Sequence, residues 1–138
     1  MESGFEVIDH TADIGIMAKG ADMKQAFANA ARGLFSLITD LKSVREIKQR
    51  NIEVVAPDRE ALLVNWLNEL IYLFETKEML FSRFDITSLT DTVLKATAYG
   101  EKINRKKHHL RRGVKAATYH MLKIEDSDGC KVSVLFDI

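Results

Sequence analysis

The sequence contains 138 residues, of which 46% are hydrophobic and 29% are charged, as is typical of one globular domain and not of a disordered chain. Its 20 basic and 20 acidic residues give a formal net charge of +0, which argues against a protein that coats nucleic acid by charge alone. The only cysteine, Cys130, excludes an intramolecular disulfide and a cysteine-based zinc cluster.

The N-terminal half predicts two short strands followed by a helix. Hydrophobic alternation indicates strands at residues 5–9 and 14–18, separated by the turn sequence HTADIG. Asp22 is a good helix N-cap, and Gln25 follows at the spacing of a capping box. Apolar residues then recur at helical spacing as far as Ile38, so we expect a helix with one buried face.

The remaining segments predict a second helix among strands. A β-branched run at 44–56 indicates a strand, and Asp58 caps a helix that extends to about Glu75. Further strands are expected at 84–89, 93–99, 114–124 and 131–137, the last after a DSDG turn. We therefore predict a single α+β domain at 1–138, with an antiparallel sheet and two main helices packed on one of its faces.

Three acidic groups at the two ends of the chain form a possible metal site. Asp13 lies between the first two strands, Asp137 is the penultimate residue, and Ile138 adds the terminal carboxylate. If the last strand pairs near the first hairpin, these oxygen donors converge and suit a hard cation such as Ca²⁺ or Mg²⁺. The alternative is that such aspartates only form Asx turns or caps.

The other polar residues leave several interpretations open. His120 lies on the apolar side of its expected strand, as a core histidine or a ligand, whereas His108 and His109 are expected in a solvated loop. Residues 101–115 contain seven positive charges, typical of either a binding patch or a solvated loop. The second helix has a polar side that includes Asn65, Asn68 and Glu69. No nucleophile elbow, P-loop or dinucleotide fingerprint is present.

Several segments together resemble the archease family over nearly the whole chain. They are DHTADIG at 9–15, AFxxAAxGLFxLITD at 26–40, LLVxWLNELIYLFE at 62–75, LFSRFDI at 80–86, GE at 100–101, VKAxTYH at 114–120 and the terminal Asp137 and Ile138. Two positions depart from the family pattern, which often has Asp at residue 104 and Glu at residue 113. Here they are Asn104 and Gly113, and both changes make this loop more basic.

The resemblance implies a metal-binding accessory protein that is not itself an enzyme. Archeases promote the guanylylation and turnover of the GTP-dependent RNA ligase that splices tRNA, and some are linked to tRNA methyltransferases. It implies that Asp13, Asp137 and Ile138 hold a divalent cation, most typically Ca²⁺. It also suggests His108, Lys115 and Glu69 as residues that contact the partner, with tRNA involved only indirectly. The basic segment adds Arg111 and Arg112 as further candidates for this contact.

Other classes of function remain possible from the sequence. The same aspartates could serve a metal-dependent hydrolase, which would also need a general base. The basic segment could make the protein an RNA-binding module. The metal could instead only staple the C-terminus in a scaffold. The N-terminus has no signal-like segment, and no apolar run reaches the roughly 20 residues that span a bilayer, so we expect a cytoplasmic protein with no membrane partner.

Overall fold

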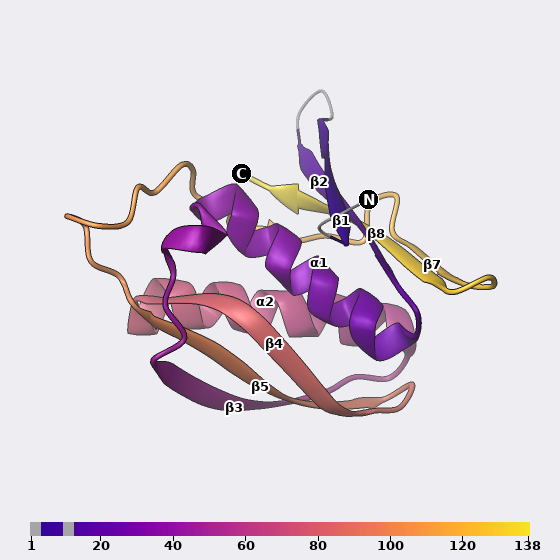
Figure 1. The fold of residues 1–138 in the computed structure, drawn as a ribbon. Helices are drawn as coiled ribbons and strands as arrows, with labels where there is room; N and C mark the ends of the chain where they lie inside the picture. Colours follow the sequence, from indigo (N-terminus) through magenta and orange to yellow (C-terminus); the bar gives the residue numbers. More distant parts are fainter. Residues whose placement is uncertain (1–3, 10–12) are drawn as a thin grey trace.

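The computed structural model describes residues 4–9 and 13–138, which form two antiparallel sheets and two long helices (Figure 1). The elements in chain order are β1 (Phe5–Asp9), β2 (Ile14–Gly20), α1 (Met23–Ile38), the 3₁₀ turn η1 (Leu41–Ser43), β3 (Lys48–Val55), α2 (Arg59–Lys77), β4 (Met79–Leu89), β5 (Val93–Lys102), β6 (Ala116–Ala117), β7 (Lys123–Asp126) and β8 (Cys130–Asp137). The predicted α+β class is confirmed.

The strands divide into two sheets, whereas the sequence led us to expect one. The larger sheet has the order β1-β2-β8-β6, with β7 also paired to β8, and the smaller has the order β3-β5-β4. All pairings are antiparallel. Helix α1 contacts β2 of the larger sheet and β4 of the smaller one, so it lies between them. Helix α2 packs on the smaller sheet and reaches β6.

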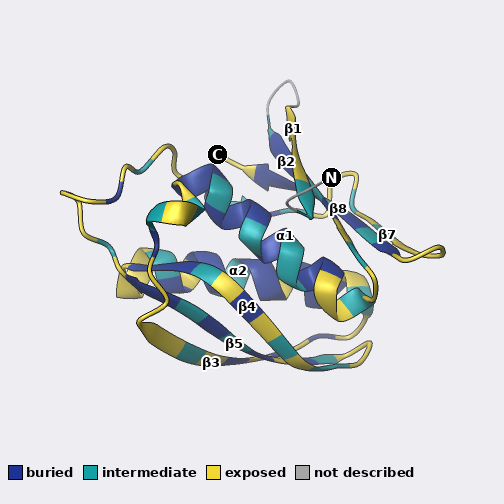
Figure 2. Ribbon diagram, in the orientation of Figure 1, coloured by how far each residue is buried: buried dark blue, intermediate teal, exposed yellow. Residues whose placement is uncertain are grey.

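Helix α1 is buried on more than the one face that its apolar spacing predicts. Among its residues only Lys24 and Gln25 are exposed, and Figure 2 shows dark blue and teal along the rest of the helix. Small side chains make this close packing possible. At Gly33 a Cβ atom would lie 2.7 Å from Ile16 of β2. The helix therefore has a sheet on either side because its sequence supplies two apolar faces and little bulk on the side toward β2.

Both predicted helix starts are confirmed by their caps. The Asp22 carboxylate accepts the backbone N–H of Gln25 at 2.8 Å, and the Asp58 carboxylate accepts that of Ala61 at 2.8 Å. Helix α2 runs two residues beyond the predicted end and stops where Glu78 adopts a left-handed conformation with φ 54°. Within the described part of the chain, no helix is both long enough and apolar enough to cross a membrane.

An aromatic cluster joins the helices to the smaller sheet. The Trp66 indole N–H donates to the carbonyl oxygen of Phe27 at 3.1 Å, which ties α2 to α1 through a buried hydrogen bond. The Trp66 ring meets Phe84 edge-on at 5.9 Å, and Phe84 also stacks with Phe35 at 5.9 Å. Aromatic pairs at these distances add to the stabilisation from burial alone.

The predicted strand at 114–124 is wrong in its middle. Within this segment only its two ends are paired with β8, through β6 at Ala117↔Phe136 and through β7 at Lys123↔Ser133. Between these two pairs the segment advances by six residues while β8 advances by three. The three excess residues loop out as a turn in which Met121 has φ 55°. Hydrophobic alternation could not reveal this loop because both flanking segments pair with the same strand.

We expect Gly100→Ala to destabilise the protein by about 3 kcal/mol or more, because the added Cβ would overlap the backbone carbonyl of Leu80 on β4. Gly113→Ala is the matched control, since nothing lies within 4 Å of its Cβ position. That variant should change the free energy of unfolding by less than about 1 kcal/mol. Urea unfolding of both variants checks this, and equal stabilities would contradict the close β4–β5 approach.

Candidate functional site

Strand pairing brings Asp13 and Asp137 to the same end of the larger sheet. Asp13 directly precedes β2, and Asp137 is the last residue of β8. Ile14 pairs with Phe136, so Asp13 and Asp137 are the residues that adjoin this last pair on the two strands. Asp13 is half-buried, Asp137 is exposed, and Ile138 beside it is 48% exposed. The condition set by the sequence, that the last strand pairs near the first hairpin, is therefore met. Residues 10–12, including His10, lie outside the described residues.

Lys115 belongs to the same end of the molecule. Its backbone N–H donates to the carbonyl oxygen of Asp137 at 2.8 Å, and its side chain is exposed. The following residues are held from the other side by α2, because the Asn68 carboxamide oxygen accepts the N–H of Ala117 at 2.7 Å. Glu69 is the next residue on α2 and is half-buried. Asn68 on the polar side of α2 thus has a structural role in positioning β6.

The donor types at this end fit a hard divalent cation. They are the two aspartate carboxylates and the terminal carboxylate of Ile138, with no sulfur ligand. In residues 4–9 and 13–138 there is no group of three or more His, Cys, Asp or Glu side chains that could hold a metal ion. A site here would therefore depend on the main-chain carboxylate as well as on Asp13 and Asp137.

The second cluster of polar groups surrounds Glu101, and it corrects the prediction that His108 is solvated. His108 is only 3% exposed, and its Nε2 atom lies 2.9 Å from the Glu101 carboxylate. Its Nδ1 atom accepts the backbone N–H of Asn104 at 2.9 Å. Since an accepting Nδ1 carries no proton, the neutral ring has its proton on Nε2 and donates it to Glu101. His108 thus holds the loop in place from inside.

The Glu101 carboxylate has three donors. Besides His108, it accepts the Lys107 ammonium at 2.6 Å and the backbone N–H of Arg45 at 2.8 Å. Burial of the carboxylate would raise its pKa, but these hydrogen bonds and the charge of Lys107 outweigh burial and lower the pKa of Glu101 from 4.5 to about 2. The carboxylate is therefore a charged anchor that joins the basic segment to the segment between η1 and β3.

The C-terminal end of α1 forms a second anchor for the basic segment. Arg111 donates its backbone N–H to Ile38 at 2.7 Å and its guanidinium to the Ser36 carbonyl at 2.8 Å. A cation here complements the negative end of the helix dipole. Thr39 donates its hydroxyl to the His109 carbonyl at 2.9 Å. Arg111 is therefore engaged with the fold although it is exposed, as Arg112 is.

His120 is exposed, so the prediction of a core histidine is wrong. It lies in the turn between β6 and β7, where its N–H is 3.3 Å from the Thr118 hydroxyl. The exposed turn follows from the three excess residues described above, which carry His120 away from the apolar face of a strand.

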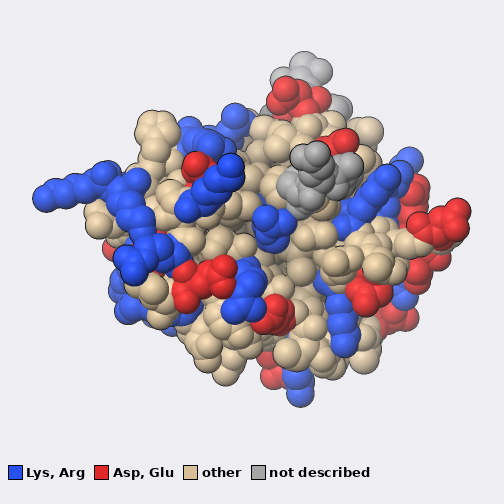
Figure 3. Space-filling model, viewed as in Figure 1, with Lys and Arg blue, Asp and Glu red and all other residues tan. Residues whose placement is uncertain are grey.

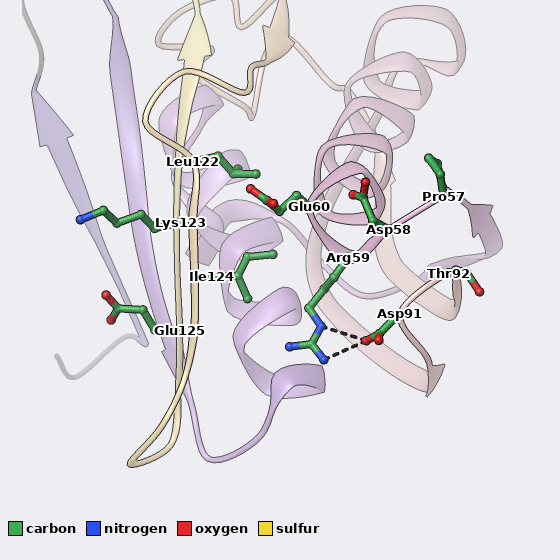
Figure 4. Close-up of a pocket in the computed structure, with 10 residues that line it drawn as sticks. All are labelled: Pro57, Asp58, Arg59, Glu60, Asp91, Thr92, Leu122, Lys123, Ile124 and Glu125. Atoms are coloured by element: carbon green, nitrogen blue, oxygen red, sulfur yellow. Dashed lines mark hydrogen bonds and ion pairs between the residues drawn. The ribbon is translucent and has the colours of Figure 1, made fainter.

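A hollow of about 810 Å³ lies away from these clusters, between the N-terminus of α2, the β4–β5 turn and β7 (Figure 4). Its Arg59 guanidinium bonds to Asp91 at 2.8 and 3.1 Å and lies 3.6 Å from Asp126. Asp58 is engaged as the cap of α2. None of the metal-binding or partner-binding candidates from the sequence lines this hollow, and its Arg59 and Asp91 charges are paired with each other.

The structure therefore defines the class of this protein, which is a small α+β protein with two antiparallel sheets and acidic groups at one end of the larger sheet. The model of the archease protein family matches residues 5–138, and the chain belongs to this family. An archease from Methanothermobacter thermautotrophicus is 41% identical over 139 residues, covering 98% of this chain and 99% of the relative. One from Sulfolobus acidocaldarius is 40% identical over 126 residues and covers 91% of each chain.

Solved structures agree with the fold. The solution structure of protein 1598 from Methanobacterium thermoautotrophicum superposes with a TM-score of 0.81 at 37% identity, covering 99% of both chains. A crystal structure from Thermotoga maritima, described as an archease and possible chaperone, gives a TM-score of 0.63 at 24% identity over 96% of both chains. The second likeness shows the fold alone.

We expect Glu101→Gln to lower the free energy of unfolding at pH 7 by roughly 1.5–3 kcal/mol, because it removes a buried charged acceptor. The carboxylate binds protons more weakly in the folded chain than in the unfolded one, so its stabilisation is full above about pH 4.5 and is lost as the pH falls toward 2. The difference between wild type and variant should therefore shrink over that range in urea unfolding.

Glu46→Gln is the control for this experiment, because the Glu46–Arg83 pair is 45% exposed on both sides, so solvent screens it and its loss should change the free energy of unfolding much less. A Glu101→Gln difference that is the same at pH 7 and pH 3 would contradict the role given to this carboxylate.

Proposed function

We propose that this protein is a metal-dependent, non-catalytic activator of the GTP-dependent tRNA-splicing RNA ligase, and that it promotes the guanylylation and turnover of that enzyme. The observation that supports the proposal is the pairing of β2 with β8, whose last pair, Ile14 with Phe136, adjoins Asp13 and Asp137 within a chain of the archease family. A partner-activating protein has no need of its own nucleophile, in keeping with the lack of nucleophile motifs in the sequence.

The chain's own residues would hold the metal and present it to the ligase. A bound divalent cation supplies positive charge to phosphate oxygens. Asp13 and Asp137 sit at the ends of paired strands, so their backbones are fixed before the ligase arrives. Lys115 adds an exposed cation next to Asp137, where it can contact phosphate or an acidic group of the ligase.

Apolar side chains near this end suit contact with a protein. The side chains of Ile8 and Leu135 both lie close to Gly15. They come within 3.5 and 2.6 Å of the point where a Cβ atom would lie on this glycine. Ile8 is 36% exposed, and Tyr119 and Ile138 are 58% and 48% exposed. Protein interfaces combine exposed apolar residues of this kind with a polar rim. The ligase would therefore dock over the outer face of β1 and β2 and the C-terminal end of β8.

We expect wild-type protein to accelerate guanylylation of the cognate RNA ligase by GTP under multiple turnover. Asp13→Ala and Asp137→Ala should each return the rate to that of the ligase alone, because each removes a metal ligand. Glu53→Ala, an exposed carboxylate on β3, should stimulate as well as wild type. Incorporation of labelled guanylate into the ligase measures these rates.

Full stimulation by folded Asp13→Ala would refute the metal-dependent mechanism. An inactive wild-type protein would refute the ligase assignment and favour a tRNA methyltransferase as the client. The same assay without ligase, with RNA as substrate, tests the competing hydrolase interpretation.

We also expect Ca²⁺ or Mg²⁺ to bind the isolated protein, as followed by isothermal titration. Binding should weaken at least about tenfold in Asp137→Ala, and also when two residues, Gly-Ser, are added after Ile138, because the added residues move the terminal carboxylate. Glu53→Ala is again the control. Unchanged affinity in the extended variant would remove the Ile138 carboxylate from the ligand set.

A further inference from the structure

A second hollow, of about 630 Å³, lies where the start of β3 meets the end of β5 and the loop that follows it. Four basic residues line it, together with one acidic, one amide and two apolar residues: Lys48, Lys102, Arg105, Lys106, Glu101, Asn104, Ile47 and Ile103. Lys48 pairs with Gly100 across β3 and β5, which places it beside Lys102 although the two are far apart in sequence.

The structure separates the basic residues of this segment into two groups. Lys107 and Arg111 are engaged with the fold, through Glu101 and the carbonyl of Ser36. The cations at the second hollow are different. Lys102, Arg105 and Lys106 are exposed, and among the described residues their side chains have no ion-pair partner, nor does that of Lys48.

The one acid at this hollow does not cancel the charge of these cations. The Glu101 carboxylate is 9% exposed and already accepts from Lys107, His108 and the N–H of Arg45. The hollow therefore presents four uncompensated positive charges on a backbone that is fixed at both ends, by Glu101 and by the end of α1.

The net charge of +0 conceals a separation of charge between two ends of the molecule. Figure 3 shows blue side chains gathered at the left of the view, over the loop that follows β5. The hollow at the start of α2, by contrast, is lined by four acidic residues and two basic ones. An anionic partner is therefore attracted to the β3–β5 end and repelled from the opposite one.

We infer that this cationic hollow, at Lys48, Lys102, Arg105 and Lys106, binds the phosphodiester backbone of single-stranded RNA without regard to sequence. Residues 101–115 contain no Phe, Tyr or Trp on which bases could stack, so the contacts would be mainly to phosphates. An acidic protein fits less well, because Ile47 is the only large apolar residue of the hollow that is strongly exposed, and a protein interface needs an apolar centre. The choice of RNA over other polyanions rests on the proposed function, in which the partner enzyme acts on RNA, but the inference uses none of the proposed metal ligands.

The test is fluorescence anisotropy of a labelled 20-nucleotide RNA without secondary structure, titrated with wild-type protein over a range of salt concentrations. The variant K48Q/K102Q/R105Q/K106Q should bind at least tenfold more weakly at low salt. Each phosphate contact contributes about 0.7 to the slope of log K against log salt for single strands, so the slope should fall by up to about 3.

The matched control is K19Q/K24Q/K95Q/K123Q, which removes the same number of charges from exposed lysines away from this hollow. It should bind RNA nearly as wild type does. Equal weakening in the two variants would overturn the inference, since only net charge would then matter. Displacement of RNA by an acidic peptide at equal charge concentration, or by millimolar GTP, would also overturn it. Equal urea midpoints for both variants establish that each is folded.

Discussion

The burial of α1 between two sheets is the constraint on which the rest of the structure depends. One side of the helix must admit β2 closely, which Gly33 and the neighbouring alanines allow, and the other must fill the space above β4 with Phe35. Once this helix is enclosed, its C-terminal carbonyls receive Arg111, and β2 on its other side carries Asp13 to the end of β8. Both polar clusters are thus positioned from the same helix.

Local signals predicted the elements well where a local interaction decides them. The caps at Asp22 and Asp58, the hairpin at 126–129 and the strand at 5–9 all depend on neighbours in sequence, and all are confirmed. The division into two sheets depends instead on which strands meet across long distances. The turn around Met121 could not be predicted for the same reason. The hydrophobic alternation of residues 114–124 does not show which residues of β8 they pair with.

The same limit on prediction from sequence applies to the candidate site residues. The basic composition of 101–115 was evident from sequence, but only the structure shows that Lys107 and Arg111 point to internal acceptors and that Lys48 joins the exposed group. His108 was expected in solvent because loops usually are solvated, yet its ring is buried and makes two hydrogen bonds. Asn104, a departure from the family pattern, supplies one of those bonds from its backbone N–H, which any residue except proline could do.

The position of β8 within the larger sheet has a consequence for the order of folding. Its partner β2 lies about 120 residues earlier in the chain, whereas β3, β4 and β5 are close neighbours in sequence. During synthesis the smaller sheet and α2 can assemble while the β1–β2 hairpin still exposes an open edge. The larger sheet gains its centre only when Cys130–Asp137 emerges, so the last strand made completes the cover of the first helix.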